Sequence, residues 1–347
     1  MKTVRVTRQE AGQRLDKYLG KYLSRAPKSF LYKMLRKKNI VLNGKKAEGR
    51  EKLAEGDEVT LYLSDETVAK FREKTDRQDE ERRGRSYDGE REGEGEVFSR
   101  IQLPVVFEDE NILVVNKPVG LLSQKADRSD VSLSEYITDY VMTPEQQRES
   151  TFRPGICNRL DRNTTGLVAA GKNMESLQYL NRLFRERDLE KYYLCLVKGK
   201  VLTRENIDGY LKKDQSHNRV SISARKMEGA VRIITVYEPL ANIFWKGKDY
   251  TLLKVHLVTG KSHQIRAHLQ SMGHPIAGDT KYGEKSLFHL FKKEFGVRYQ
   301  LLHAWKLCLG SPGYLPQKYR GAVWQAPLPE KFEEVLIGMG VDMKVLY

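Results

Sequence analysis

The pattern of apolar and polar positions predicts a small unit of helices and strands near the start of the chain. Apolar residues recur at helical spacing over 15–22 and again over about 28–37. A short apolar strand over 40–42 then runs into Asn43-Gly44, a dipeptide that readily takes the positive φ angles of a tight hairpin turn. Another alternating strand, VTLYL, follows, and we therefore expect one folded unit within 1–64.

Charged residues and glycine dominate 65–100, where few side chains can bury apolar surface. Such a composition does not offset the entropy that ordering costs, so a charged flexible linker is predicted. We expect this linker to let the small unit move independently of the residues that follow it.

A larger unit is predicted over 101–330, and 331–347 is expected to be a C-terminal tail. Apolar periodicity predicts a helix over 173–187 with Asn173 as its N-cap, and HQIRAHLQSMG predicts a short helix that ends at Gly273. Apolar runs predict strands at 103–107, 112–115, 167–170, 192–197, 251–258 and 301–309.

Length and composition narrow the class of protein. The chain has 347 residues, a length typical of about two domains. No stretch approaches the ~18 apolar residues of a membrane-spanning helix, and the start, MKTVRVTRQEAGQR, has no apolar signal region. The three cysteines form no CxxC pair, which fits a reducing compartment. We expect a cytoplasmic protein without a membrane partner.

Positive charge is concentrated in the small unit. The chain has a formal net charge of +15, and residues 1–64 hold 16 Lys and Arg against 7 Asp and Glu, a net of +9. A basic surface attracts polyanions, so a nucleic acid is the expected partner. The alternative is a solvated surface that only keeps the chain soluble.

The usual signatures of cofactor and metal sites are absent from the sequence. There is no GxGxxG opening a helix, no GxxxxGK[ST] phosphate loop and no GxSxG elbow. His263 and His268 are five residues apart, so they do not share a helix face as the ligands of an HExxH site do. We expect no cofactor and no metal, and any catalysis must come from the protein's own side chains.

The stretch NRLDRNTTGL, 158–167, is a candidate catalytic motif. Its carboxylate, Asp161, stands between Arg159 and Arg162, and nearby cations favour the ionised form that a nucleophile or base needs. The alternative is a structural ion pair in a loop.

Two other stretches combine polar and aromatic side chains with strands. In TGKSHQIRAHL, 259–269, Gln264 and Arg266 can hold a planar polar group or a carboxylate, or they can be the polar caps of a helix. In KYYLCLVKG, 191–199, Tyr193 can stack on a base or lie in the core.

Together these stretches resemble the RluA-type family of RNA pseudouridine synthases. The central motif of that family runs His-Arg-Leu-Asp-x-x-Thr-Ser-Gly-Leu, and NKPVGLLSQ (116–124) and LLHAWKL (301–307) resemble its flanks. Asn158 stands where the family has His, and Thr165 where it has Ser. The resemblance implies an α+β fold, with a mixed, mainly antiparallel sheet and flanking helices, and a monomer that needs no cofactor.

The small unit resembles the RNA-binding domain named after ribosomal small-subunit protein four. RLDKYL, IVLNGKKA and GDEVTLYL carry this resemblance. It implies that basic side chains of the unit face RNA phosphates, namely Arg14, Lys17, Lys28, Lys33, Arg36 and Lys37. The pairing of such a domain with this family is typical of enzymes that act on large-subunit ribosomal RNA. We therefore expect a synthase acting on 23S ribosomal RNA; the alternatives are a tRNA-directed synthase and a non-catalytic RNA-binding factor of ribosome assembly.

The resemblance also implies roles for four residues. The target uridine must leave the base stack, and Arg159 is the candidate wedge for the vacated space. Tyr193 is expected to pack on the flipped uracil and is a possible carrier of its carbon 5 proton. Asp161 is expected to act on the nucleotide, with Arg266 paired to it. Whether Asp161 attacks carbon 1′, attacks the base or removes the 2′ proton is left open by the sequence.

Overall fold

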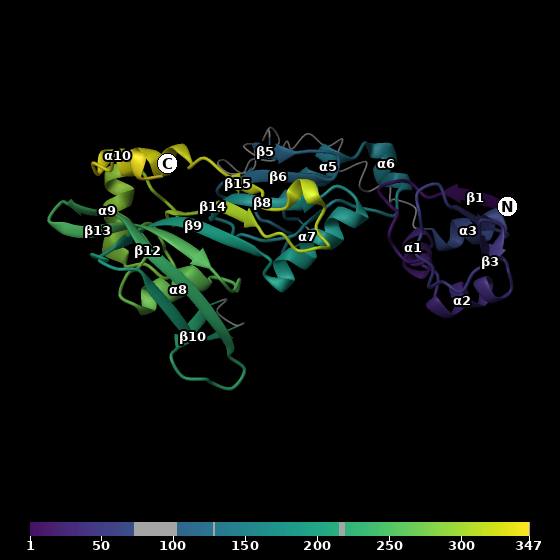
Figure 1. Cartoon of the computed structure of the whole chain (residues 1–347), viewed down its shortest axis with the longest axis horizontal. Coiled ribbons are helices and arrows are strands. Elements are labelled where there is room, and N and C mark those ends of the chain that lie inside the picture. The colour runs from purple at the N-terminus through teal and green to yellow at the C-terminus, as the bar shows by residue number, and fades with distance from the viewer. Residues whose placement is uncertain (73–102, 128, 215–218, 347) are drawn as a thin grey trace.

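The computed structural model describes residues 1–72, 103–127, 129–214 and 219–346 (Figure 1). We refer to 1–72 as the N-terminal unit and to the described residues from 103 onward as the large unit. Most of the predicted linker, from residue 73 on, lies outside the described residues.

The N-terminal unit packs two helices and a short third one against a four-stranded antiparallel sheet in the order β1-β4-β2-β3. The Asn43-Gly44 turn joins β2 to β3 with φ angles of 49° and 71°, as the dipeptide predicted. The predicted apolar faces form the core of this unit, with Leu15, Leu19 and Leu35 almost fully buried. Its elements are β1 Lys2–Arg5, α1 Leu15–Tyr22, α2 Lys28–Arg36, β2 Ile40–Leu42, β3 Lys45–Lys46, β4 Glu58–Leu61 and α3 Asp65–Phe71.

Helix α3 corrects the predicted start of the linker. The side chain of Ser64 accepts a hydrogen bond from the Thr67 amide and caps the helix. Val68 is buried, and the ring of Phe71 lies 4.7 Å from that of Phe30. These apolar contacts hold 65–71 against the rest of the N-terminal unit, although the segment is rich in charge.

The large unit is built on a mixed, mainly antiparallel sheet, so the predicted α+β class is confirmed. The described strands run in the order β11-β10-β12-β13-β9-β14-β8-β6-β5, with β15 beside β14 and β7 beside β8. Among the described pairs of this sheet, β14 and β8 are parallel and the others antiparallel. The strands are β5 Val105–Glu108, β6 Ile112–Lys117, β7 Gly155–Ile156, β8 Thr165–Gly171, β9 Leu189–Lys198, β10 Glu205–Asp214, β11 Arg219–Ser223, β12 Val231–Trp245, β13 Lys248–Leu257, β14 Leu302–Leu309 and β15 Val323–Gln325.

Helices cover both faces of this sheet (Figure 1). One face, which includes Tyr193 and Cys195 of β9, packs against α5 and α8, whereas the other packs against α7, α9 and α10. Asn173 caps α7 as predicted, because its side chain accepts a hydrogen bond from the Ser176 amide. The helices are α5 Leu133–Val141, α6 Pro144–Glu149, α7 Met174–Glu186, α8 Gln264–Ser271, α9 Lys285–Phe295 and α10 Glu330–Gly338, with 3₁₀ turns at Gln317–Tyr319 and Met343–Leu346.

The predicted C-terminal tail is wrong. Residues 331–347 contain most of α10, and Phe332, Val335 and Leu336 are buried in the core beneath β9 and β13. The large unit therefore extends to the last described residues, because the apolar side of α10 covers one face of the sheet.

The parallel contact between β8 and β14 requires a glycine. Gly166 has φ of +113°, and a Cβ at that position would lie 2.2 Å from the carbonyl oxygen of Ala304. The close approach fixes the start of β8 on β14 and, with it, the loop that precedes β8.

The two units are in direct contact, which differs from the expectation of independent movement. The Thr151 amide donates a hydrogen bond to Glu10 Oε1 at 2.7 Å, and the Thr151 hydroxyl donates to the same oxygen at 2.9 Å. The Met174 amide donates to the Gln9 carbonyl at 3.0 Å, and the Gln13 side-chain amide donates to the Thr151 hydroxyl at 3.2 Å. We call these contacts of residues 9–13 with 150–151 and the start of α7 the joint.

Candidate active site

Asp161 stands in a tight loop between β7 and β8. The Thr164 amide donates to the Asp161 carbonyl at 3.0 Å and closes a turn directly after the aspartate. The carboxylate is 26% exposed, so it is accessible from one side of the large unit.

Arg266, on the first turn of α8, links Asp161 to a second carboxylate. Its Nη1 lies 2.9 Å from Asp161 Oδ2, so the expected ion pair is present. Its Nε and Nη2 donate to the two oxygens of Asp279 at 2.7 and 2.9 Å. Such a two-point contact fixes the plane of the guanidinium. Arg266 is 8% exposed and Asp279 1%.

Charge balance keeps both members of the buried pair ionised. Burial would lower the pKa of Arg266, but hydrogen bonding and charge from Asp279, and then from Asp161, raise it above its ordinary value. Burial would raise the pKa of Asp279, but the Arg266 guanidinium lowers it overall. The second carboxylate thus holds Arg266 in place as a permanent cation beside Asp161.

His263 and Tyr282 also lie beside Asp161. His263 Nε2 is 4.0 Å from Asp161 Oδ2, and its Nδ1 is 2.9 Å from the Tyr282 hydroxyl oxygen. Burial lowers the pKa of His263, which favours the neutral imidazole at pH 7. The residue takes a left-handed backbone conformation, with φ of 56°, directly before α8.

Tyr193 reaches the site from β9. It is 7% exposed and shares its strand face with Cys195 and Val197, while Tyr192 lies on the other face. Burial, and then the negative charge of Asp161, raise the pKa of the Tyr193 hydroxyl, so it stays protonated at neutral pH. The ring is both part of the core and close to Asp161.

A buried lysine fastens the Asp161 loop to β6. Lys117 Nζ donates hydrogen bonds of 2.8 to 2.9 Å to the carbonyls of Pro118, Leu121 and Arg162. Burial lowers the pKa of Lys117 to about 7, and the charge of Asp161 acts in the opposite direction. Through these bonds, Lys117 holds Arg162, the residue after Asp161, to the turn that follows β6.

Side chains on either side of Asp161 fix the rest of the loop. The Ser123 hydroxyl donates to the Leu160 carbonyl at 2.8 Å and accepts from the Leu160 amide at 3.0 Å. Thr165 Oγ1 lies 2.8 Å from His303 Nδ1, and the Gln300 side-chain amide donates to the Thr164 hydroxyl at 3.1 Å. The carboxylate is thus held before any substrate arrives.

Comparison with known proteins identifies the family. The family described as RNA pseudouridylate synthase matches residues 111–271. Ribosomal large subunit pseudouridine synthase C of Escherichia coli (strain K12) is 30% identical over 326 residues, which cover 90% of each chain. This chain belongs to the RNA pseudouridine synthases. Its activity is the isomerisation of uridine to pseudouridine in RNA.

Further relatives and a solved structure are also similar to this RNA pseudouridine synthase. Ribosomal large subunit pseudouridine synthase C of Vibrio cholerae is 28% identical and aligns over 85% of this chain and 84% of its own. An uncharacterised RNA pseudouridine synthase of Mycoplasma genitalium is 28% identical, over 87% of each chain. In three dimensions, human RNA pseudouridylate synthase domain containing 4 superposes with a TM-score of 0.53 at 20% identity, covering 69% of this chain and 94% of that one. This likeness supports the fold.

Asn158 has a structural position in the synthase. Its side-chain amide donates to the Leu167 carbonyl at 3.0 Å, and its side-chain oxygen accepts from the Ala169 amide at 2.9 Å. Both groups therefore bind the backbone of β8, and the residue that replaces the family's usual His holds the Asp161 loop to this strand.

The two arginines that flank Asp161 in the sequence have other neighbours. Arg162 Nη2 lies 3.9 Å from Asp130, and Arg159 Nη1 donates a long hydrogen bond of 3.5 Å to Gln124. Arg266, from a distant part of the chain, provides the cation at Asp161 instead. Arg159 is exposed beside the site.

The basic residues predicted to bind RNA lie on the N-terminal unit and not at the Asp161 site. All are exposed, on α1, on α2 or directly beside one of these helices: Arg14, Lys17, Lys28, Lys33, Arg36 and Lys37. Arg14 is partly neutralised by Asp16 at 2.8 Å.

Lys117, Asp279 and His263 were assigned no role from the sequence. Two signals could have indicated Lys117 and Asp279: a lysine inside an apolar strand and an aspartate at the end of HPIAGD, because buried charges need partners. Their partners become apparent only from the fold.

No metal or membrane feature lies in the described part of the synthase. It contains no group of three or more His, Cys, Asp or Glu that could hold a metal ion. Within the same residues, no helix is long and apolar enough to cross a membrane.

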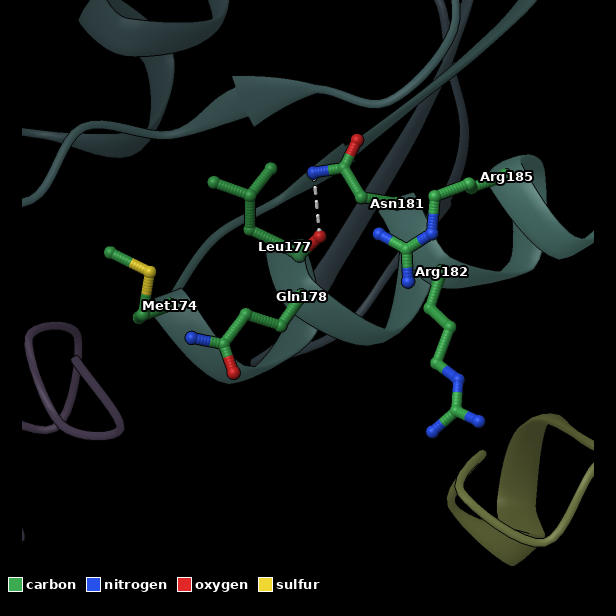
Figure 2. Close-up of a pocket in the computed structure, with 6 residues that line it drawn as sticks. All are labelled: Met174, Leu177, Gln178, Asn181, Arg182 and Arg185. Carbon is green, nitrogen blue, oxygen red and sulfur yellow. Dashed lines mark hydrogen bonds between the residues drawn. The ribbon is translucent and has the colours of Figure 1, made fainter. Parts of the chain in front are cut away.

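A pocket of about 470 Å³ lies away from Asp161, on the outer side of α7 (Figure 2). All of its lining side chains come from this one helix: Met174, Leu177, Gln178, Asn181, Arg182 and Arg185. Arg182 stacks on the ring of Tyr314 and pairs with Glu186. The pocket shares no lining residue with the Asp161 site.

Proposed function

We propose that the synthase isomerises uridines of large-subunit ribosomal RNA and that Asp161 is its catalytic residue. One observation carries the second part of this proposal. Arg266 binds Asp161 Oδ2, whereas Oδ1 accepts no hydrogen bond from the residues that the structure describes. An ionised carboxylate with one oxygen held and the other free is suited to act as a nucleophile or base.

The reaction needs only acid–base and covalent steps. The bond from ribose carbon 1′ to uracil N1 breaks, carbon 1′ bonds to uracil carbon 5, carbon 5 loses a proton and N1 gains one. No atom is gained or lost between substrate and product. Asp161 initiates the cleavage, while Arg266 holds its carboxylate through Oδ2.

Tyr193 and Arg159 complete the proposed site. The target uridine leaves the stack, and Arg159 fills the space that it vacates. The buried ring of Tyr193 packs on the uracil and keeps it beside carbon 1′ while it turns. Because the Tyr193 hydroxyl is held protonated, it serves as a relay for the carbon 5 proton and not as the free base.

Two observations support the proposed substrate class: the names of the relatives and the positive charge of the N-terminal unit. Several relatives of similar length are named ribosomal large subunit pseudouridine synthase C. We propose the same class of RNA for this chain, captured by the exposed basic residues of α1 and α2. A tRNA-directed enzyme is the alternative.

The test of Asp161 is Asp161→Asn, which keeps the shape of the side chain and removes its charge. We expect no pseudouridine in a large-subunit RNA fragment, with RNA binding kept. Pseudouridine is read by carbodiimide modification and primer extension, and free uracil is measured in parallel. Conversion above about a hundredth of the parent rate, a barrier change of only about 2.7 kcal/mol, would exclude the proposed role.

The test of substrate class is a map of pseudouridines in ribosomal and transfer RNA from cells with and without the gene. Loss confined to large-subunit ribosomal RNA is expected. Loss confined to transfer RNA would establish the alternative.

A further inference from the structure

The hydrogen bonds of Tyr282 determine which nitrogen of His263 carries the proton. The Val220 amide donates to the Tyr282 hydroxyl oxygen at 3.0 Å. Among the described residues, the group within hydrogen-bond distance that can accept the hydroxyl proton is His263 Nδ1, at 2.9 Å. Donation by the hydroxyl in this direction places the proton of the neutral imidazole on Nε2.

His263 therefore directs an N–H group toward the carboxylate of Asp161. Its Nε2 lies 4.0 Å from Oδ2, the oxygen that Arg266 already binds at 2.9 Å. Contacts at catalytic groups are often long before substrate binds and shorten in the complex. Both donors approach the same oxygen, so the carboxylate has one occupied side and one free side.

We propose that His263 is a positioning residue for Asp161: its Nε2–H and Arg266 together hold Oδ2, which leaves Oδ1 as the reacting oxygen. The inference rests on the proposed role of Asp161. The held oxygen prevents the carboxylate from rotating, so that the free oxygen keeps a fixed direction toward the nucleotide. Tyr282 acts one step further out, because its hydroxyl selects the tautomer.

The charge on the imidazole also matters to Asp161. Charged and titratable groups facing His263 are Asp161, Arg266, Lys281, Asp279 and Tyr282. With neutral His263, Arg266 is the cation that binds the Asp161 carboxylate directly, and Lys117 and Lys281 also act on it through their charge. Protonation of His263 adds another positive charge beside Asp161, which weakens the carboxylate as a nucleophile or base. Because burial lowers the pKa of His263, this loss begins below pH 6.5.

The experiment compares His263→Asn with His263→Gln. Asparagine tolerates the left-handed backbone at this position but is too short to reach Oδ2, whereas the amide of glutamine reaches about as far as Nε2. In single-turnover assays at pH 7.5, we expect the Asn variant to lose about 10- to 100-fold in saturated rate, the worth of one hydrogen bond to a charged group. KM should be unchanged, and the Gln variant should recover most of the rate.

A pH series separates positioning from simple folding effects. The parent enzyme should lose rate as the pH falls below 6.5, and neither variant should show that loss, because neither amide titrates. Tyr282→Phe keeps the ring beside Arg266 but removes the hydroxyl, and we expect a rate loss of about 3- to 10-fold, as for one neutral hydrogen bond. His289→Gln removes an exposed imidazole on α9 and is the matched control, with no change expected.

Two outcomes overturn the inference. One is a parental rate in folded His263→Asn, and the other is the same acid loss in parent and variant. Asp161→Asn is assayed alongside, so that the two proposals can fail separately. An active Asp161→Asn rejects the role of the aspartate, whereas an inactive Asp161→Asn with a fully active His263→Asn rejects only the role of His263.

Discussion

Two buried carboxylates, one in the active site and one in the joint, are stabilised in opposite ways. Asp279 is 1% exposed and binds the Arg266 guanidinium through both oxygens. Glu10 is 3% exposed and accepts hydrogen bonds only from neutral donors, the amides and hydroxyls of Thr7 and Thr151 and the hydroxyl of Ser150, among the described residues. The first is bound directly by a counter-charge, whereas the second is bound by dipoles, and the Lys21 ammonium acts on it only through its charge.

The two kinds of hydrogen-bond partner suit the different structural roles of Asp279 and Glu10. Asp279 orients one guanidinium within a single unit, and an ion pair of two planar groups restricts geometry most strongly. Glu10 joins two units through groups that water can replace, so separating the units costs less than breaking the site. We therefore expect the active site to be rigid and the joint to be the weaker contact.

The largest expected effect tests the planar pair. Arg266→Lys keeps the charge, but an ammonium cannot bind Asp161 and both oxygens of Asp279 in one plane. We expect the single-turnover rate to fall by about 100-fold or more, comparable to the loss of one preorganised electrostatic donor. Exposed Arg298→Lys is the control. Near-normal turnover would leave only a general positive potential as the role of Arg266.

The next effect is on stability as well as rate. Asp279→Asn leaves a buried guanidinium without its main partner, and we expect about 3–5 kcal/mol less free energy of unfolding for the large unit. Because Arg266 lowers the pKa of Asp279 in the folded state, the pair contributes stability above pH 3.8, which is lost as the pH falls through the lowered value. Urea unfolding at several pH values measures this. A variant as stable as the parent would show that the pair contributes no net stability.

A smaller effect is expected at the joint. Glu10→Gln keeps the size of the side chain, but its amide nitrogen cannot accept the bonds from Thr7 or Thr151, which costs about 1–3 kcal/mol of contact between the units. We expect the units to separate more readily in small-angle scattering and KM to rise several-fold, with the saturated rate unchanged. Glu55→Gln, exposed on the same unit, is the control. A fall in the saturated rate would mean that the joint shapes the active site.

The smallest effect concerns single phosphate contacts. Replacing Lys33 and Arg36 of α2 by Gln should reduce the salt dependence of RNA binding. The slope of log K against log salt concentration should become shallower by about 0.7 per lost contact to single-stranded RNA. The same exchange at Lys45 and Lys46 of β3 removes equal charge from another exposed part of the unit. Equal slopes in the two double variants would show that α2 is not the RNA-binding helix.

Sequence patterns predicted features that depend on neighbouring residues. They missed features that depend on burial by segments far apart in the sequence. Helix α7 follows from apolar periodicity, its Asn173 cap and the Asn43-Gly44 turn follow from residue type, and all three were confirmed. Strands β10 and β12 were not predicted: β10 carries many polar residues, and β12 is largely apolar but is interrupted by Pro239, where the register with β13 shifts.

Burial by distant segments explains the other errors. Nothing in the sequence around α10 shows that a sheet face needs covering, and the charge of 65–71 concealed the few apolar residues that α3 buries. Within the site, the family resemblance paired Arg266 with Asp161, but the second carboxylate at Asp279 and the three carbonyls around Lys117 emerge only when the chain folds back.

The joint also has a consequence for the order of events during synthesis. The core of the N-terminal unit is built from residues 4–71, so it can fold soon after these residues leave the ribosome. Glu10 must wait for Thr151, which is 141 residues further along the chain. During that interval the Glu10 carboxylate is hydrated and the basic helices are already formed. The nascent chain therefore presents the surface that we propose binds RNA before the residues around Asp161 come together, and we expect docking of the two units to be among its last folding steps.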